Sequence, residues 1–242
     1  MIIPNVRASF GKNEIRILTQ ALHRRTGRNQ RAWDDLLAEE GLDSLLDHPE
    51  THSAIMEGDN LGSVSPKLTF YVMVRHTLLE CGLNDPAIAD YVAALLIEFA
   101  VNGRAHRIAQ HDDASYRYLV DLVTDMEGES SERRKFLLQA HLGNYSLWLS
   151  GLFPDYVVAR VHRHGAPGFD YYEDLGATGY RMASEFGIAD QFDLARIYVD
   201  VADGFRAVRR ALNHVSDRFF FPRSPSPIDR MLRQIVDGHR SH

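Results

Sequence analysis

Residues 65–103 decide the fold and read SPKLTFYVMVRHTLLECGLNDPAIADYVAALLIEFAVNG. Ser65-Pro66 and Asp85-Pro86 each place a capping side chain directly before a proline, a combination typical of the first turn of a helix. Gly82 is expected to end the first helix, and Asn102-Gly103 the second. Both segments are apolar on nearly every side, as expected of helices at the centre of a protein. The stretch therefore predicts a central, buried, antiparallel helical hairpin.

The rest of the chain has the same helical character on both sides of this hairpin. Apolar residues recur every three or four positions, and no window alternates convincingly with the period of two that a strand requires. The pattern predicts further helices over residues 13–25, 31–40, 114–126, 131–152, 154–164, 170–186, 190–219 and 226–237. We therefore predict an all-α fold, a multi-helix bundle of roughly eight to ten helices around the hairpin.

Composition shifts divide the chain into three parts. Residues 58–66 (GDNLGSVSP) are rich in turn-forming residues and separate an N-terminal helical region, 1–62, from a main helical bundle, 63–221. Three prolines after residue 221 then form a connector to a C-terminal amphipathic helix within 222–242. The apolar stripe of that helix must be covered, either by the same chain or by another one.

Charge is distributed in blocks, although the formal net charge of the whole chain is only −6. Residues 1–31 carry +6 and residues 32–62 carry −9. Since consecutive helices usually pack together, we expect an acid in 34–59 to pair with at least one of four arginines, Arg24, Arg25, Arg28 and Arg31. The overall negative charge and the lack of a recognisable binding motif make nucleic acid the least favoured partner.

Cysteine content and hydropathy restrict the class of protein. Cys81 is the single cysteine, which excludes an intramolecular disulfide and a multi-cysteine metal site. The first residues lack the apolar core and cleavage site of a secretory signal. The stretch 136–154 is free of charged residues but contains five polar side chains, too many for a lipid-exposed helix. We expect a cytoplasmic protein that does not bind membranes.

Three polar residues interrupt the apolar hairpin, namely Arg75, His76 and Glu98. A charged side chain in a buried helix requires a partner. Antiparallel pairing is expected to bring Asp90 within reach of Arg75 and His76, and Lys67 near Glu98. These residues either form internal salt bridges that fix the helix register or line a ligand pocket. We favour the salt bridges.

His141 and Tyr145 lie on one face of the predicted helix 131–152, together with Leu138 and Trp148. A single histidine on an apolar face is usually a core residue with a satisfied hydrogen bond, and metal binding would require two further donors nearby. His141 and Tyr145 are therefore candidates for a buried polar cluster or a ligand site. We favour the buried cluster, in which they have a structural role.

The metal-binding candidates are His106, His111 and Asp112. An adjacent His-Asp pair helps to bind the metal in HD-type phosphohydrolases, but about one such pair is expected by chance in a chain of this composition. No other stretch matches that family, so we infer no resemblance from the pair. Glu-x-x-His, His-Glu-x-x-His, the P-loop and the dinucleotide-binding glycine motif are all absent. We therefore expect neither a metal nor a cofactor.

Two features are typical of contact surfaces. The helix 170–186 places a notch of small residues beside large aromatic ones, at Tyr171, Tyr172, Leu175, Gly176, Gly179, Tyr180 and Ala183. The other feature is the amphipathic C-terminal helix. Each indicates packing within the chain, a homodimer seam or a site for another protein.

The sequence does not decide whether the chain is an enzyme. The favoured function is a soluble helical interaction or small-ligand-binding protein without catalysis. The alternative is a metal-dependent hydrolase with a buried His/Asp/Glu site. That alternative requires one pocket that collects His76, Glu98, His106, His111 and His141.

Overall fold

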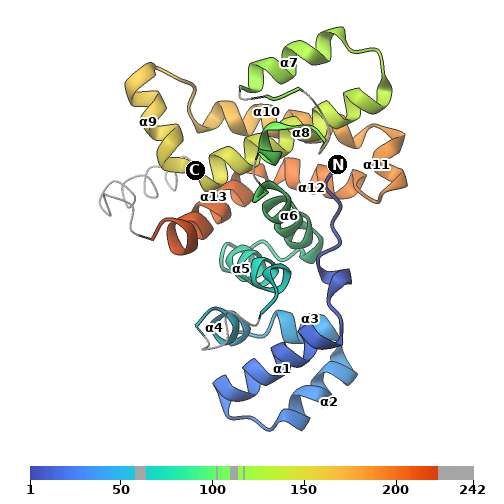
Figure 1. Ribbon diagram of the computed structural model, residues 1–242, viewed down its shortest axis with the longest axis vertical. Helices are drawn as coiled ribbons and strands as arrows, with labels where there is room; N and C mark the ends of the chain where they lie inside the picture. Colours follow the sequence, from blue (N-terminus) through green and yellow to red (C-terminus); the bar gives the residue numbers. More distant parts are fainter. Residues whose placement is uncertain (58–63, 102, 110–113, 117, 223–242) are drawn as a thin grey trace.

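The computed structural model describes residues 1–57, 64–101, 103–109, 114–116 and 118–222 (Figure 1). Within these residues every regular element is helical, with 13 α-helices, of which ten have at least seven residues. The prediction of an all-α multi-helix bundle is confirmed. The α-helices are α1 (Lys12–Thr26), α2 (Gln30–Glu40), α3 (Leu42–Leu46), α4 (Thr51–Met56), α5 (Pro66–Glu80), α6 (Pro86–Phe99), α7 (Leu119–Gly128), α8 (Glu132–Leu152), α9 (Pro154–His164), α10 (Phe169–Ser184), α11 (Gly187–Gln191), α12 (Ala195–Asp203) and α13 (Phe205–Val215).

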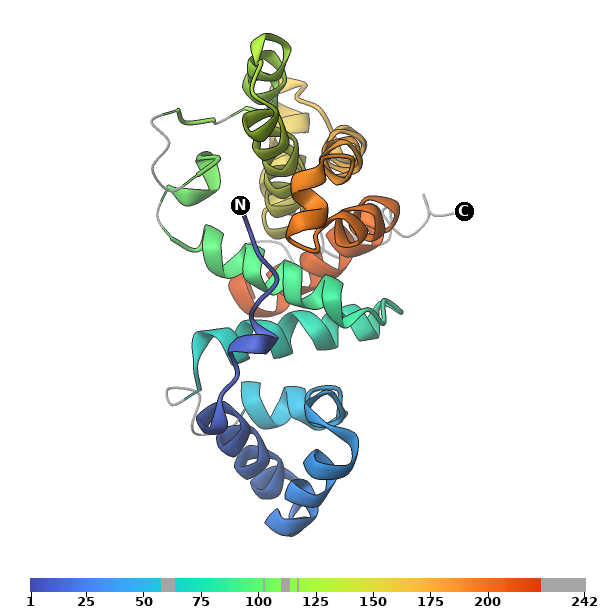
Figure 2. The same ribbon diagram turned by 90° about the vertical axis from the view of Figure 1, so that its right-hand side faces the viewer.

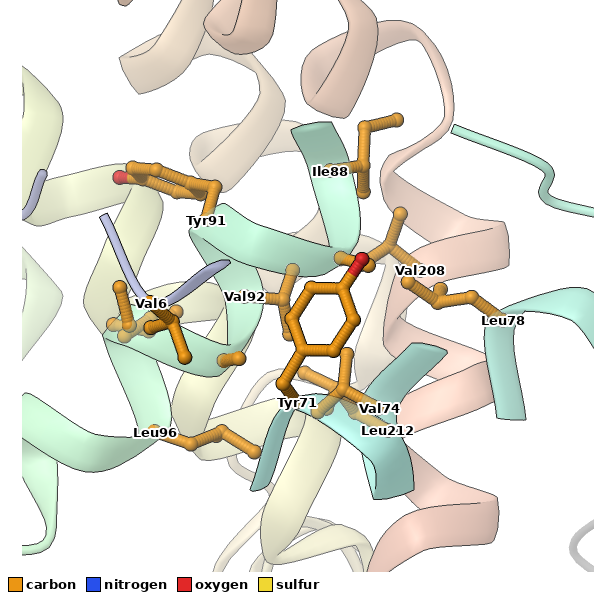
Figure 3. Packing of buried hydrophobic residues seen from close by; sticks show 14 of the residues in the cluster. Val6, Tyr71, Val74, Leu78, Ile88, Tyr91, Val92, Leu96, Val208 and Leu212 are labelled. Atoms are coloured by element: carbon orange, nitrogen blue, oxygen red, sulfur yellow. The ribbon is translucent and has the colours of Figure 1, made fainter. Parts of the chain in front are cut away.

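The predicted hairpin is present as α5 and α6. The Ser65 side chain accepts a hydrogen bond from the backbone N–H of Leu68, and Asp85 accepts one from that of Ala87. The two helices pack against each other and are buried on most sides. Figure 3 shows the hairpin at the centre of the core. Tyr71 and Val74 of α5 and Val92 of α6 pack near Val208 and Leu212 of α13.

The hairpin lies between two groups of helices (Figures 1 and 2). The N-terminal helices α1–α4 lie at one end of the molecule and contact α5 through α4. On the other side, α8 packs against α10 and α13, and α10 packs against α12. Short helical turns, η1 (Arg7–Ser9) and η3 (Arg104–His106), lie in the connections. The C-terminal connector and helix predicted within 222–242 lie almost entirely outside the described residues.

The prediction of one long helix over 190–219 is wrong. The structure divides it into α11, α12, α13 and a π-helical turn, η4 (Ser216–Phe220). Asp193 adopts a left-handed conformation with φ of 55°, which ends α11 before α12 begins, and Gly204 separates α12 from α13. The apolar row predicted for this stretch is nevertheless fully buried, at Leu194, Tyr198, Val201, Phe205, Val208, Leu212 and Val215.

The helix predicted over 114–126 starts later than expected, at Leu119. Tyr116 instead donates its backbone N–H to the carbonyl oxygen of His106 at 2.7 Å, and its hydroxyl donates to Asp125 at 2.6 Å. These bonds attach Tyr116 to η3 and to the last turns of α7.

The small-residue notch of α10 is filled by the chain itself. A Cβ atom added at Gly179 would lie 2.8 Å from the carbonyl oxygen of Gln139 in α8, and Gly143 of α8 lies directly against the ring of Tyr180. Gly176 receives the ring of Phe205 in the same way. The notch therefore lets α8, α10 and α13 approach closely and is not open to a second molecule.

The charge blocks at the N-terminus do pair with each other. Arg25 of α1 lies 3.2 Å from the carboxylate of Glu50 and 3.4 Å from that of Glu57. The expected ion pair between the basic helix and the acidic segment is confirmed. No helix in the described part of the chain has the length and apolar character needed to cross a bilayer.

Candidate functional site

Arg75 and His76 lie on the face of α5 that meets the N-terminal helices. Arg75 is 1% exposed, and its Nε and Nη2 donate to the carboxylate of Asp47 at 2.7 and 2.6 Å. The ring Nε2 of His76 lies 2.8 Å from the carbonyl oxygen of Leu46. Both side chains therefore anchor the end of α3 to the hairpin. A planar guanidinium that binds a carboxylate through two nitrogens is a rigid link of this kind.

The partners expected across the hairpin are wrong. Asp90 accepts a hydrogen bond from the backbone N–H of Arg7 at 2.8 Å, and Glu98 accepts one from Arg104 Nε at 2.7 Å, where Lys67 was expected. Burial raises the pKa of the Asp90 carboxyl. The expectation considered only the two helices of the hairpin, whereas three other segments of the chain reach its polar side chains.

Four of the predicted residues do come together on one side of α8. The rings of His141 and Tyr145 stack at 6.1 Å between centroids, and the ring of His106 lies 5.6 Å from that of Tyr145. Glu98 joins them through Arg104, whose guanidinium lies 5.7 Å from the ring centre of Phe99. We call this group the polar–aromatic cluster, consisting of Glu98, Phe99, Arg104, His106, His141, Tyr145 and Trp148.

His141 is the most deeply buried histidine of this cluster. Its side chain is 3% exposed, and its pKa is lowered to about 3, chiefly by burial and further by the charge of Arg104. A backbone hydrogen bond to Ala105 acts in the opposite direction. Its Nε2 atom has no hydrogen-bond partner among the described residues. The ring is therefore neutral near pH 7 and is a poor general base there.

The residues required for a metal-dependent hydrolase do not converge. His76 lies beside α3, whereas Glu98, His106 and His141 lie beside α8. His111 and Asp112 are outside the described residues. Within the part of the chain that the structure describes, no three His, Cys, Asp or Glu side chains are grouped closely enough to hold a metal ion.

Four aspartates line a groove between the start of α6 and α11–α12. The groove has a volume of about 660 Å³ and includes Asp85, Asp190, Asp193 and Asp200. Asp85 caps α6, and Asp200 accepts a hydrogen bond from Arg196 at 3.2 Å. At least two of these carboxylates therefore have structural partners.

A buried ion-pair network between α10 and α13 was missed by the sequence patterns. Glu173 is 6% exposed and accepts hydrogen bonds from Arg206 Nε at 2.7 Å and from Arg209 Nε at 2.9 Å. Arg209, fully buried, also donates to Asn213 at 2.7 Å. The spacing of Asp170 and Glu173 is that of a capping box, but α10 starts at Phe169, one residue before Asp170, so neither side chain caps the helix in this way. The network joins two helices and has a structural role.

A surface group of tyrosines surrounds Arg160, where α9 and α10 meet the start of α7. The guanidinium of Arg160 lies 5.7 Å from the ring centre of Tyr118 and 5.6 Å from that of Tyr156, and it donates a hydrogen bond to the Tyr156 hydroxyl at 3.2 Å. Tyr171 and Tyr172 of α10 add two rings 5.6 Å apart, and Arg160 lies near enough to Tyr172 to lower its pKa, although burial raises it more. We call these five residues the tyrosine–arginine surface.

Three of the four tyrosines in the tyrosine–arginine surface are open to solvent, and Tyr172 lies buried beneath them. Tyr118 is 55% exposed, Tyr156 is 49% exposed and Tyr171 is 37% exposed. The hydrogen bond to Tyr156 raises the pKa of Arg160, so its charge persists at every physiological pH. No carboxylate among the described residues forms a salt bridge with Arg160. A cation that forms no salt bridge with a described carboxylate thus shares one surface with several exposed aromatic rings.

The sequence indicated only part of this surface. Tyr171 and Tyr172 were singled out as a contact face, and Tyr156 and Arg160 have the four-residue spacing that puts two side chains on one side of a helix. Tyr118 could not be placed beside them, because the connection between α6 and α7 has no periodicity that predicts its course.

Comparisons with protein-family models, with curated proteins and with solved structures find no match to this chain. The polar–aromatic cluster and the tyrosine–arginine surface are therefore the features from which its function is inferred. The centre of the cluster, His141 and Tyr145, is buried, and the histidine there is neutral. The surface is accessible and charged.

Proposed function

We propose that this chain is a non-catalytic binding protein that recognises a protein partner through the tyrosine–arginine surface. The observation that supports this function is the exposure of Tyr118, Tyr156 and Tyr171 beside Arg160, which forms no salt bridge with any described carboxylate. Tyrosine and arginine are enriched in the residues that dominate the binding energy of protein interfaces. A tyrosine buries a large area at a small cost in conformational entropy.

The charge of the surface indicates the chemistry of the partner. Arg160 is followed one turn later by the exposed Arg163, and both precede the C-terminal end of α9. An arginine binds a carboxylate through two parallel hydrogen bonds, and these strengthen when flanking aromatic rings exclude water. The partner is therefore an acidic polypeptide segment with an apolar side chain next to a carboxylate.

Nucleic acid fits this surface less well. Tyrosine rings and arginine also bind single-stranded nucleic acid, but tight binding normally neutralises several phosphates. The surface offers Arg160, with Arg163 one turn further along α9, and the whole chain has a net charge of −6. A metal-dependent hydrolase is also less supported, because His76 lies apart from the other required residues.

The experiment is a selection of peptides against purified protein. A library of random peptides displayed on phage is selected on the wild type, and enriched peptides are titrated against the wild type, Arg160→Ser and Tyr156→Ser. We expect enrichment of Asp and Glu next to apolar residues, and an affinity loss of about tenfold or more for each variant. Arg31→Ser, which removes an exposed arginine far from the surface, is the matched control and should bind as the wild type does.

Two outcomes contradict the proposal. One is that peptides selected on the wild type bind both variants equally well, which would place their site elsewhere. The other is that a single-stranded oligonucleotide binds more tightly than any selected peptide, with a steep dependence on salt. That result would favour nucleic-acid binding.

A further inference from the structure

The last described turn of the chain packs against the N-terminal half of the molecule. The ring of Phe219 in η4 lies 5.5 Å from the ring of His52 in α4. Next to it, Arg218 reaches the carboxylate of Glu80 at the end of α5, at 3.3 Å. This salt bridge is more than half exposed on both sides, so it stabilises the contact only slightly. The start of η4 is fixed separately, because it continues α13 and the Ser216 hydroxyl donates a buried hydrogen bond to the carbonyl oxygen of Leu152 at 2.7 Å. The attachment of the residues after Arg218 therefore depends mainly on the packed rings.

Two further ring pairs continue this attachment. The ring of Phe220 lies 6.2 Å from that of Phe70 in α5, and the ring of Phe221 lies 5.8 Å from that of Phe153 at the start of α9. Phe220 and Phe221 are 40% and 44% exposed, so they cover their partners only in part. The contact between Phe219 and His52 is the innermost of the three.

His52 has an unusual position in this contact. Its Nε2 atom is buried and has no hydrogen-bond partner among the described residues. The ring of His76 lies 5.8 Å away, and that histidine already uses its Nε2 on the carbonyl oxygen of Leu46. A neutral imidazole packs well here, whereas a protonated one would bring an unpaired N–H and a full charge into a buried site.

The charged groups around His52 come from three elements. Burial is the main cause that lowers its pKa, followed by Arg218 of η4 and His76 of α5. Glu80 of α5 and Glu57 after α4 act in the opposite direction and are the weaker influences. His76 is itself kept neutral mainly by burial, and its charged neighbours are Asp47, Glu80 and Arg75.

We propose that His52 is an acid-sensitive latch for the C-terminal end of the described chain. The neutral ring holds Phe219 and with it the end of η4. The protonated ring releases them, because its charge would face Arg218 while Nε2 has no acceptor among the described residues. Release exposes the rings of Phe70 and Phe153 as an apolar surface. This latch is independent of the tyrosine–arginine surface, and it makes the attachment of the end of η4 depend on pH.

The test is hydrogen exchange measured by mass spectrometry on the full chain, for the peptide that contains 216–221. Protection factors, corrected for the intrinsic effect of pH, are compared from about pH 7.5 to about pH 5.5. If release restores the ordinary histidine pKa of about 6.5, protection should fall by up to about tenfold over this range. His52→Gln should have the same protection at both pH values. The control His214→Gln, an exposed histidine of α13, should behave as the wild type does.

A second measurement does not depend on any variant. In the wild type, the nuclear magnetic resonance titration of the His52 ring should have its midpoint below 6.5 and follow the loss of protection in 216–221. Protection that is constant with pH would refute the latch. A pH dependence that persists unchanged in His52→Gln, or a His52 midpoint that does not follow the exchange, would also refute it.

Discussion

Replacing His141 with glutamine should remove much of the acid sensitivity of folding. In the folded state the pKa of His141 is about 3, because burial disfavours its charged form, whereas an unfolded chain has a histidine pKa of about 6.5. As the pH falls below the unfolded value, the unfolded state binds a proton that the folded state does not, and the free energy of unfolding decreases. This stability is complete above about pH 6.5 and is lost progressively down to about pH 3.

The two pKa values determine the size of the effect. By the linkage relation, His141 alone lowers the free energy of unfolding, relative to neutral pH, by about 1.4 kcal/mol at about pH 5.5 and by about 2.7 kcal/mol at about pH 4.5. These losses are a large fraction of the stability of an ordinary domain. Glutamine can still donate a hydrogen bond to Ala105 and never takes up a proton at these pH values.

The assay is urea denaturation of the wild type, His141→Gln and His164→Gln at about pH 7.5, 5.5 and 4.5. The half-buried His52 and the buried His76 also have lowered pKa values and contribute to all three proteins. The difference in pH dependence between wild type and His141→Gln therefore isolates His141. His164 is exposed at the end of α9 and serves as the control. Equal losses of stability in the wild type and His141→Gln would refute the reasoning.

Three further substitutions test the packing, each by urea or thermal denaturation. Gly179→Ala should destabilise the protein by about 1–3 kcal/mol, because the new Cβ atom would lie 2.8 Å from a backbone oxygen of α8. The control Gly187→Ala, with open space around it, should have little effect. Equal melting temperatures of these two variants would contradict the close approach of α8 and α10. Glu173→Gln should cost about 3–5 kcal/mol, because it leaves the fully buried Arg209 without a full negative charge; a loss below about 1 kcal/mol would show that the pair is not buried in solution. Arg25→Ala should cost less than about 1 kcal/mol, since its salt bridges are exposed, and a larger loss would contradict that placement.

The hairpin and most helix starts were predictable because their causes are local. Ser65 and Asp85 satisfy free N–H groups only a few residues away, so the signal and its effect lie in the same stretch of sequence. The same holds for Ser131, whose side chain caps α8 at the predicted start of that helix. The division of 190–219 at Asp193 and Gly204 was not predictable from periodicity. The buried row continues across both positions, and only the backbone conformation changes.

The candidate residues show the same contrast. The shared face of His141 and Tyr145 follows from their four-residue spacing on α8. Their meeting with His106 depends on how the segment between α6 and α7 crosses α8, which no local pattern encodes. The partners of Arg75 and Glu98 were mispredicted for a related reason. Arg75 donates to Asp47 and Glu98 accepts from Arg104, and such partners outside the hairpin leave no mark on the helical pattern.

The sequence by itself determined the all-α class, the caps and the apolar faces, because hydrogen bonds between near neighbours and the 3.6-residue period act along the chain. It also determined that the N-terminal charge blocks would attract each other. Only the tertiary structure decided which faces remain exposed and which polar groups meet. It fills the notch of α10 with α8, it surrounds Arg160 with tyrosines from three segments, and it places His52 against Phe219. These contacts join residues far apart in sequence, so their energies depend on how whole helices pack and not on any short stretch of the chain.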